Sequence, residues 1–309
     1  MRVIVFGSSE FCVPTLRRLL EGGADVPLVV TQPDRPRGRG RCTTCTPVRL
    51  AADEAGIPVA QPPRVRTPEF VAQVTELRPD ALVVAAFGQI IPRAMLDAPS
   101  LGPVNVHASL LPRWRGAAPI HRAILEGDAA TGVTTMFMDA TLDTGDILLC
   151  RETPIEPGDD TGTLTARLAE MGAELLLQTL EGLAAGTVTR IPQDGSRSTY
   201  AAPITPDDAR IRWDEPADRC LRRVQAMAPR PGAVTTLCGK RVKVWSAQRV
   251  EGQAEPGLIV AQGAAGVTVG AGHGCLLVTE AQPEGCKRMP ASAWACGCRI
   301  VPGETRFDP

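Results

Sequence analysis

The sequence predicts an α/β protein with a Rossmann-like parallel sheet, followed by a small C-terminal β domain. Over the first two hundred residues, short β-branched runs alternate with helical patterns, which is typical of a parallel sheet covered by helices. Runs such as Leu82–Ala86 are apolar on both faces, as expected for strands buried between helix layers. Beyond residue 206, short strand patterns separated by glycine-rich turns predominate. These observations predict two domains of different class.

The first domain is expected over residues 1–188. Its last helical pattern is the longest, with Leu164, Leu168 and Leu175 at helical spacing. The predicted strands are Val3–Phe6, Leu28–Thr31, Ala81–Ala85, Val104–His107 and Gly132–Met138. The predicted helices lie near residues 10–22, 47–56, 67–77, 118–126 and 160–185.

Residues 189–206 are expected to form a linker, because proline and an Asp-Gly pair interrupt any regular pattern there. The second domain is expected over residues 207–309 and begins with a helical segment near residues 217–226. Its predicted strands are Val234–Leu237, Lys240–Trp245, Gly257–Val260, Gly266–Val269 and Cys275–Glu280. Five short strands with glycine-rich turns indicate a small antiparallel β domain.

Composition excludes several classes of protein. The 309 residues carry a net charge of −1, which argues against a chain that coats nucleic acid indiscriminately. The ten cysteines are scattered and no secretory signal precedes them. No apolar run reaches the roughly 18–20 residues that span a bilayer. We therefore expect a soluble cytoplasmic protein with reduced thiols and no membrane contact.

Two polar residues, Asn105 and His107, follow the apolar start of a predicted strand. Side chains two residues apart on a strand point to the same face, so they are expected to project together. An amide can donate a hydrogen bond to an oxyanion, and an imidazole can move a proton. Asp143 adds a carboxylate in the glycine-containing turn Leu142-Asp143-Thr144-Gly145. Together these groups can pass an acyl carbon to an amine without a protein nucleophile.

The same residues carry a resemblance to a known family. Asn105-Val106-His107, the following Ser109-Leu110-Leu111-Pro112 and the later Leu142–Gly145 resemble the folate-dependent formyltransferases. The longer run from Ser109 to Ile120 resembles the branch of that family that formylates methionyl-tRNA. Further matching segments are Val3–Gly7, Thr31–Pro36, Gly38–Gly40, Val83–Pro92 and Gly239–Trp245. The resemblance therefore covers essentially the whole chain.

This resemblance implies direct transfer of a formyl group from 10-formyltetrahydrofolate, a co-substrate, to the amino group of methionyl-initiator tRNA. It assigns catalysis to Asn105, His107 and Asp143, and leaves open how the imidazole and the carboxylate divide the proton transfer. It implies an OB-like barrel that binds tRNA in the second domain, and we expect a monomer. Folate contacts are implied for residues of two segments that follow predicted strands: Phe87, Gly88, Ile90, Ser109, Leu110, Leu111 and Pro112.

Residues 35–49 contain five arginines and no acidic residue. The resemblance places a tRNA acceptor-reading loop here and matches Arg39 to the arginine that contacts the acceptor end. Arg37 and Arg41 flank Arg39, and Lys240 and Lys243 are the tRNA contacts expected in the second domain. Arginine suits this role because it forms forked phosphate contacts, reads base edges and stacks.

Cysteine and histidine give no strong signal for a metal. Cys42 and Cys45 have C-x-x-C spacing where relatives commonly have a basic pair followed by an apolar residue. Zinc prefers four ligands, and the other close pair, in residues 296–298, lies in the other predicted domain, so we expect no metal site. His121 and His273 lack the neighbours that mark His107 and are expected to be structural.

Two other functions are compatible with parts of this pattern. An N-formyltransferase acting on a nucleotide sugar can share the Asn-His-Asp set and a C-terminal barrel, but the basic loop and the Lys240–Trp245 segment favour tRNA. A folate- or RNA-binding protein without catalysis is disfavoured by the intact set of Asn105, His107 and Asp143.

Overall fold

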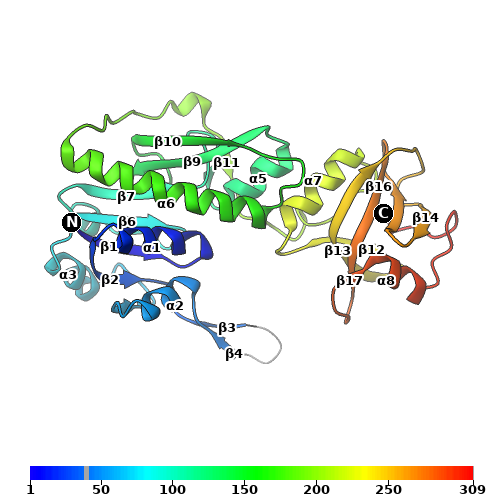
Figure 1. Ribbon diagram of the computed structural model, residues 1–309, viewed down its shortest axis with the longest axis horizontal. Coiled ribbons are helices and arrows are strands. Elements are labelled where there is room, and N and C mark those ends of the chain that lie inside the picture. The colour runs from blue at the N-terminus through cyan, green and yellow to red at the C-terminus, as the bar shows by residue number, and fades with distance from the viewer. Residues whose placement is uncertain (38–41, 309) are drawn as a thin grey trace. The chain divides into compact units, whose positions relative to one another are not determined.

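The computed structural model describes residues 1–37 and 42–308, with only the backbone described for residues 35–37, 42 and 43. The chain forms two compact units, each with its own main sheet (Figure 1). The first unit comprises residues 1–119, 130–154 and 165–201, and the second comprises residues 120–129, 155–164 and 202–309. The division therefore does not fall at one point in the sequence.

The main sheet of the first unit has the strand order β10-β9-β7-β6-β1-β2-β5. Its strands are β1 (Arg2–Gly7), β2 (Asp25–Val30), β5 (Val59–Ala60), β6 (Ala81–Ala85), β7 (Gly102–His107), β9 (Ala130–Phe137) and β10 (Ile147–Pro154). From β5 to β7 all neighbouring strands are parallel, as the alternating sequence pattern predicted. Separately, β3 (Arg35–Arg37) and β4 (Cys42–Thr44) form an antiparallel pair, and β8 (Arg115–Gly116) pairs in parallel with β11 (Tyr200–Ala201).

One edge of the main sheet differs from the predicted parallel arrangement, because β9 and β10 are antiparallel to their neighbours. His107, the last residue of β7, pairs with Thr134, whereas Val104 pairs with Phe137 at the end of β9. The start of β9 thus lies beside the carboxyl end of β7, so the chain turns back next to β7 instead of crossing to the opposite end of the sheet before β9 begins. The strand β10 was not predicted from the sequence either.

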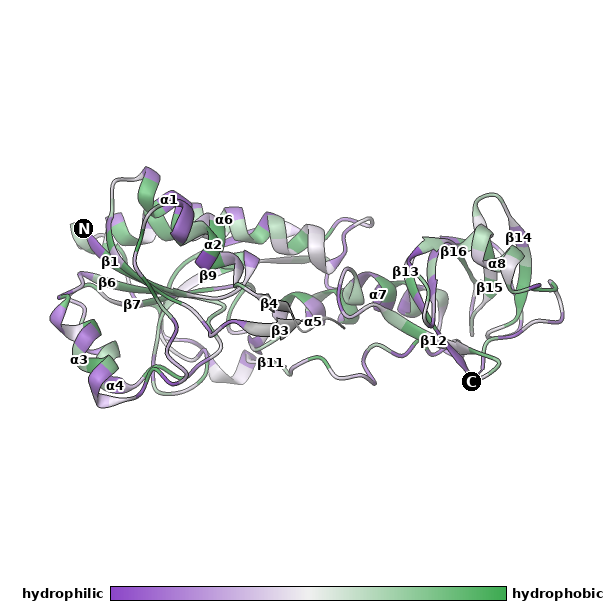
Figure 2. Ribbon diagram, turned by 90° about the horizontal axis from the view of Figure 1, so that it is seen from below, coloured by the Kyte–Doolittle hydropathy of each residue, from purple (hydrophilic) through white to green (hydrophobic). Residues whose placement is uncertain are grey.

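Helices cover both faces of this sheet, with α1 and α6 on one face and α3 and α4 on the other (Figure 2). The helices up to residue 201 are α1 (Val13–Glu21), α2 (Pro47–Glu54), α3 (Pro68–Glu76), the one-turn α4 (Arg93–Leu96), α5 (Pro119–Glu126) and α6 (Thr161–Ala185), with short 3-10 turns η1 (Glu10–Cys12) and η2 (Gly195–Arg197). Of these, α5 after its first residue and the first four residues of α6 belong to the second unit. Both α2 and α3 begin at a Thr-Pro pair. The threonines Thr46 and Thr67 accept hydrogen bonds from backbone N–H groups of the first turn, and proline fits the first helical position.

The apolar core lies between the central strands and the helices. Ile4, Phe6 and Leu82 face α3 and α4 in one cluster of buried side chains. On the other face, Gly172 of α6 lies so close to β7 that an added Cβ would be 2.7 Å from a methyl group of Val106. This close packing fixes the position of β7.

Residues 189–206, expected to be a linker, divide between the two units at Ala201. Ile191 exchanges two backbone hydrogen bonds with Ile147, and the Thr199 carbonyl accepts from Arg115 N at 2.9 Å. Proline and glycine do prevent long secondary structure here, but hydrogen bonds to β8 and β10 hold residues 191–201 against the first unit.

The second unit contains an antiparallel sheet with the order β12-β13-β16-β15-β14, and β17 pairs with β16. Its elements are α7 (Ala217–Met227), β12 (Ala233–Leu237), β13 (Lys240–Val250), β14 (Ile259–Gly263), β15 (Gly266–Gly270), β16 (Cys275–Pro283), β17 (Met289–Pro290) and α8 (Ala291–Gly297). The five predicted strands and α7 are present, whereas α8 and β17 were not predicted. In its core the Phe307 ring stacks between Trp213 and Trp294, with ring centroids 5.2 and 5.9 Å away.

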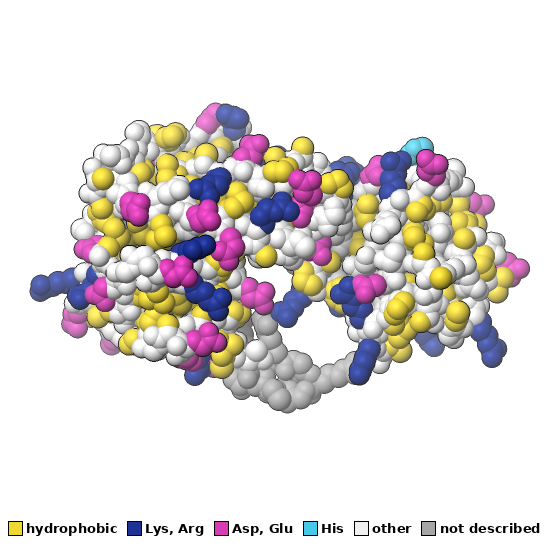
Figure 3. Space-filling model, viewed as in Figure 1, with side chains coloured by type: hydrophobic (Ala, Val, Ile, Leu, Met, Phe, Trp, Pro, Cys, Tyr) yellow, Lys and Arg dark blue, Asp and Glu magenta, His cyan; other side chains and the backbone are white. Residues whose placement is uncertain are grey.

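Charged side chains of both signs are intermixed over the face of the first unit that is in view in Figure 3. Within residues 1–37 and 42–308, no helix has the length and apolar character needed to cross a membrane.

A partly buried ion pair joins α5 to the start of the long C-terminal segment of the second unit. Arg122 donates to both Asp208 carboxylate oxygens, at 2.8 and 3.1 Å, and Thr205 donates to the same carboxylate. Burial raises the pKa of Asp208, but the hydrogen bonds from Arg122 and Thr205 outweigh it and hold the pKa at about 2. The lowered pKa means that the ionised form contributes stability above about pH 4, which is lost as the pH falls toward about 2.

We therefore expect Asp208→Asn to destabilise the second unit by about 2 kcal/mol at neutral pH. The difference from wild type should shrink as the pH falls below about 4, because the wild-type carboxyl then becomes protonated as well. Urea unfolding followed by tryptophan fluorescence tests this, since Trp213, Trp245 and Trp294 all lie in the second unit. If Asp208→Asn destabilised the protein equally at neutral pH and below about pH 4, the assigned role of the Asp208 charge would be contradicted.

Candidate active site

Asn105 and His107 lie on the same face of β7, as the strand alternation predicted. Their residues are 9 and 6 % exposed, so both side chains are largely withdrawn from water. β7 is held between β6 and β9, and α6 packs on it through Gly172. The strand therefore presents the amide and the imidazole from a rigid support.

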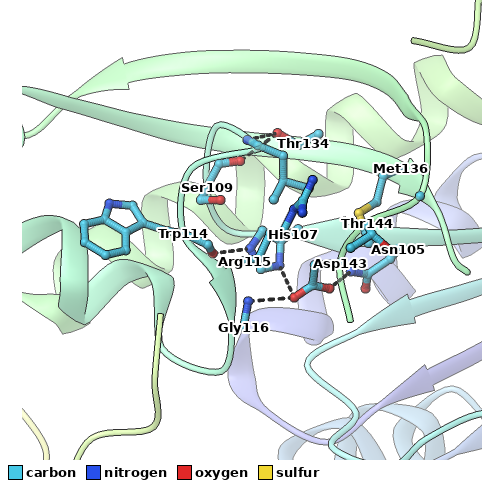
Figure 4. Close-up of polar contacts among 12 residues, drawn as sticks. Asn105, His107, Ser109, Trp114, Arg115, Gly116, Thr134, Met136, Asp143 and Thr144 are labelled. Carbon is cyan, nitrogen blue, oxygen red and sulfur yellow. Dashed lines mark hydrogen bonds and ion pairs between the residues drawn. The ribbon is translucent and has the colours of Figure 1, made fainter. Parts of the chain in front are cut away.

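Asp143 reaches the same place from the loop between β9 and β10 (Figure 4). Its carboxylate accepts a 2.8 Å hydrogen bond from the Gly116 N–H, and the Asn105 amide donates to it across 3.5 Å. His107 Nδ1 lies 3.7 Å from the same carboxylate. Asp143 has a φ of +53°, a left-handed conformation that aspartate tolerates better than most residues. The three predicted catalytic residues thus form one cluster.

The imidazole of His107 is oriented from its other side by the backbone. Its Nε2 lies 2.8 Å from the Trp114 carbonyl oxygen. A carbonyl oxygen can only accept a hydrogen bond, so Nε2 carries a proton and donates it. Nδ1 is then the nitrogen that faces the Asp143 carboxylate.

Ser109 holds the turn that follows β7 and is not placed as a nucleophile. Its hydroxyl donates to the Arg113 carbonyl at 2.7 Å, and the residue is only 1 % exposed. Thr134 of β9 donates to the Ser109 carbonyl at 2.7 Å and accepts from Leu111 N at 3.2 Å. These bonds fix the shape of residues 109–113.

The two predicted folate segments leave the sheet at the same edge, because β6 and β7 are parallel neighbours. Ligand crevices of parallel sheets form beyond such strand ends. Among the predicted contacts, the Phe87 ring is buried and packs edge-on against Phe6, with ring centroids 5.3 Å apart. Ile90, by contrast, is 85 % exposed, and Gly88 is exposed at a φ of +81°. Leu110 and Pro112 are half-buried, whereas Leu111 is buried.

Of the predicted tRNA contacts, Arg39 and Arg41 lie outside the described residues, and Arg37 is the last residue of β3. Lys240 and Lys243 lie on β13, in the second unit. The Lys243 ammonium donates to the Pro231 carbonyl at 2.6 Å and lies 5.3 Å from the centre of the Trp245 ring.

A polar network secures the base of the β3–β4 hairpin. Arg49 forms an ion pair with Asp34, and Gln61 donates to the same carboxylate at 2.7 Å. The Gln61 hydrogen bond, helped by the Arg49 charge, holds the pKa of Asp34 below its usual value. Cys45 directs its thiol toward Asp34, across 3.7 Å. In the described parts of the chain, no group of three or more His, Cys, Asp or Glu side chains is placed to hold a metal ion.

Four residues that touch the catalytic cluster or the turn beside it were not predicted: Trp114, Gly116, Thr134 and Gln193. Two of them act through backbone atoms, so their side chains give no signal in the sequence. Gln193 and Thr134 contact residues tens of positions away, and only the folded chain brings them together.

Sequence profiles of known families match both parts of the chain. The formyl transferase family matches residues 1–180, and the formyl transferase C-terminal domain family matches residues 203–299. The chain therefore belongs to the formyl transferase family.

Similar full-length proteins narrow the comparison. The methionyl-tRNA formyltransferase of Citrifermentans bemidjiense is 47% identical over 98% of this chain and 95% of its own length. That of Symbiobacterium thermophilum is 48% identical over 100% of this chain and 96% of its own length. Among solved structures, HypX from Aquifex aeolicus matches 100% of this chain with a TM-score of 0.70 at 19% identity. This chain spans 49% of that structure, and the likeness concerns the fold.

Proposed function

We propose that this protein transfers the formyl group of 10-formyltetrahydrofolate to the amino group of methionine on initiator tRNA. The observation that carries the proposal is the cluster of Asn105, His107 and Asp143 at the end of β7. Similarity to methionyl-tRNA formyltransferases over nearly the whole chain supports methionyl-tRNA as the acceptor.

The reaction requires a neutral amine to attack the formyl carbon. A tetrahedral intermediate forms, the bond from carbon to the folate nitrogen breaks, and a proton passes from the amine to that nitrogen. The Asn105 amide donates to the oxyanion of the intermediate, an interaction worth about 3–4 kcal/mol in other acyl transfers. Asn105 suits this role because its amide projects from β7 beside His107 and lies 3.5 Å from the Asp143 carboxylate.

His107 and Asp143 handle the proton. Nε2 of His107 is committed to the Trp114 carbonyl, so Nδ1 is the nitrogen that exchanges a proton beside Asp143. The Asp143 carboxylate, fixed by the Gly116 N–H, stabilises the protonated ring. Transfer in this proposal is direct, in keeping with the Ser109 hydroxyl, which is buried and donates to the Arg113 carbonyl and so is not placed as a nucleophile.

Binding of the two substrates uses different parts of the chain. The folate occupies the crevice beyond β6 and β7, where Gly88, Ile90 and Leu110 are at least partly exposed. Residues 1–188 act as the catalytic domain, and residues 189–206 connect them to residues 207–309, with residues 191–201 held by hydrogen bonds to β8 and β10. Residues 207–309 add the tRNA contacts of Lys240 and Lys243. The protein works as a cytoplasmic monomer that contacts the acceptor stem through Arg37, Arg39 and Arg41.

A formylation assay tests the proposal. Methionyl-tRNA is incubated with the protein and the formyl donor, and the product is resolved on an acid gel. A UDP-amino sugar is offered in a parallel reaction. Formylation of the tRNA and not of the sugar is expected. Transfer to the sugar alone would favour a nucleotide-sugar N-formyltransferase. Transfer to neither acceptor would favour a folate- or RNA-binding protein without catalysis.

The loop that carries Asp143 gives a second prediction. An added Cβ at Gly145 would lie 1.9 Å from the Phe137 carbonyl oxygen, so Gly145→Ala must displace this loop. We expect kcat to fall about tenfold or more, because small misplacements of catalytic groups are costly. Gly158→Ala is the matched control, since a Cβ there meets nothing within 4 Å. Equal activity of the two variants would contradict the need for a glycine at residue 145.

A further inference from the structure

Gln193 connects the loop that carries Asp143 to the strand on the other side of the site. Its amide Nε2 donates to the carbonyl of Asp143 at 2.9 Å and to that of Gly145 at 2.7 Å. Its Oε1 accepts from Arg115 Nε at 2.9 Å. Arg115 is adjacent to Gly116, whose N–H donates to the Asp143 carboxylate. The hydrogen bonds therefore hold Asp143 at both its backbone and its side chain.

These contacts determine which way the Gln193 amide points. Two carbonyl oxygens require the NH₂ group, and a guanidinium requires the amide oxygen. The amide nitrogen has two carbonyl oxygens and, across 3.8 Å, the Met136 sulfur as acceptors, and the oxygen has its own donor. A reversed amide would lose its hydrogen bonds to both carbonyls and to Arg115.

The backbone on either side keeps Gln193 in place. Two residues earlier, Ile191 exchanges backbone hydrogen bonds of 2.8 and 2.9 Å with Ile147 at the start of β10. Farther along, the Thr199 hydroxyl accepts from Trp114 N at 2.8 Å. Residues 191–199 thus run beside the site and are anchored at both ends.

Asp143 needs such external support. It adopts a left-handed backbone conformation, and only its bond from Gly116 is short among the contacts of its carboxylate. Its neighbour Leu142 does not pack into the core, since it is 60 % exposed, and Thr144 is only half-buried. We propose that Gln193 is a positioning residue, which fixes the Asp143 loop so that the carboxylate faces His107. This inference rests on the proposed function and adds a residue to it.

Two substitutions of Gln193 distinguish this positioning role from a general contribution to the stability of the fold. Gln193→Met keeps the size of the side chain and removes all of its hydrogen bonds. Gln193→Glu keeps the acceptor for Arg115 but directs a carboxylate oxygen at two carbonyl oxygens, which repel it. Gln178→Met is the matched control, because Gln178 is an exposed glutamine of the same unit whose contact is with Arg151, at the sheet edge.

For both Gln193 variants we expect kcat to fall about 10- to 100-fold. KM for the tRNA and for the formyl donor should stay within about threefold of wild type, since substrate binding uses other groups. The ratio of Gln193→Glu to wild-type kcat should rise as the pH is lowered, because a protonated carboxyl can again donate to one carbonyl. Amide hydrogen exchange should become faster in residues 139–146, and Gln178→Met should match wild type in every measurement.

Wild-type kcat in both variants, or a loss confined to KM for the tRNA, overturns the proposal. A normal Gln193→Glu enzyme beside a defective Gln193→Met enzyme also overturns it, since the Arg115 contact would then suffice. If Gln193→Met does not fold, Gln193→Glu decides on the same measurements. Failure of wild type to formylate methionyl-tRNA would contradict the proposed function instead, and the exchange rates would still test the positioning of the loop.

Discussion

Replacing His107 by alanine is expected to lower kcat for formyl transfer about 100- to 10,000-fold, the usual contribution of a positioned acid-base group. The ring is held from both sides, by the Trp114 carbonyl at Nε2 and by Asp143 at Nδ1, so no water can take its place with equal orientation. Because the group acts in the transition state, affinities for the folate and the tRNA should change only a few-fold.

The measurements are single-turnover rates and equilibrium binding of each substrate. His273→Ala is the control, because that histidine is exposed and lies in the second unit. Near-normal turnover of the His107→Ala enzyme would refute the assignment of the active site.

Substitutions of Asn105 and Asp143 extend the same test. Asn105→Ala should lower kcat about 100- to 1,000-fold through loss of the oxyanion contact. Asp143→Asn retains an oxygen that can accept from the Gly116 N–H, yet it removes the charge beside His107 Nδ1. The kcat of a double variant with Asp143→Asn and His107→Ala should therefore be little lower than that of His107→Ala alone, because the two residues act as a unit. Additive losses would show that they act independently.

The sequence predicted most of the fold because its elements carry strong local signals. The all-apolar run of β6 and the leucine spacing of α6 specify a buried strand and a long amphipathic helix without knowledge of the rest of the chain. The direction of β9 has no such local signal. Whether β9 runs parallel or antiparallel to β7 depends on the end of the sheet at which the chain re-enters, and the apolar pattern of β9 is the same for both directions.

The site was predictable to the extent that its chemistry resides in side chains. Asn105 and His107 follow from strand alternation, and Asp143 follows from the family motif. The Trp114 carbonyl, the Gly116 N–H and the Gln193 amide complete the site, but two of them are backbone groups. The third lies in a segment whose proline and glycine content predicted a linker. The supporting contacts therefore became visible only in the folded chain.

The basic segment near the β3–β4 hairpin carries the second large effect that we expect. Arg39→Ala should lower kcat/KM for methionyl-initiator tRNA by about 10- to 100-fold, since a base-edge contact is worth about 1–3 kcal/mol. The affinity for the folate should not change, because the folate site that we propose lies at the segments after β6 and β7, which do not include Arg39. The exposed Arg66, which precedes α3, provides the control variant Arg66→Ala.

Comparison of initiator and elongator methionyl-tRNA distinguishes reading of the acceptor end from attraction to phosphates. Phosphate contacts are independent of sequence, so Lys240→Ala and Lys243→Ala should weaken the binding of both tRNAs by the same factor. Each should also reduce the slope of log affinity against log salt by about one. Arg39→Ala should instead reduce the ratio of kcat/KM for the initiator tRNA to kcat/KM for the elongator tRNA, because a contact near the terminal base pair favours one sequence over the other. If Arg39→Ala and wild type have the same kcat/KM on both tRNAs, this segment does not recognise tRNA.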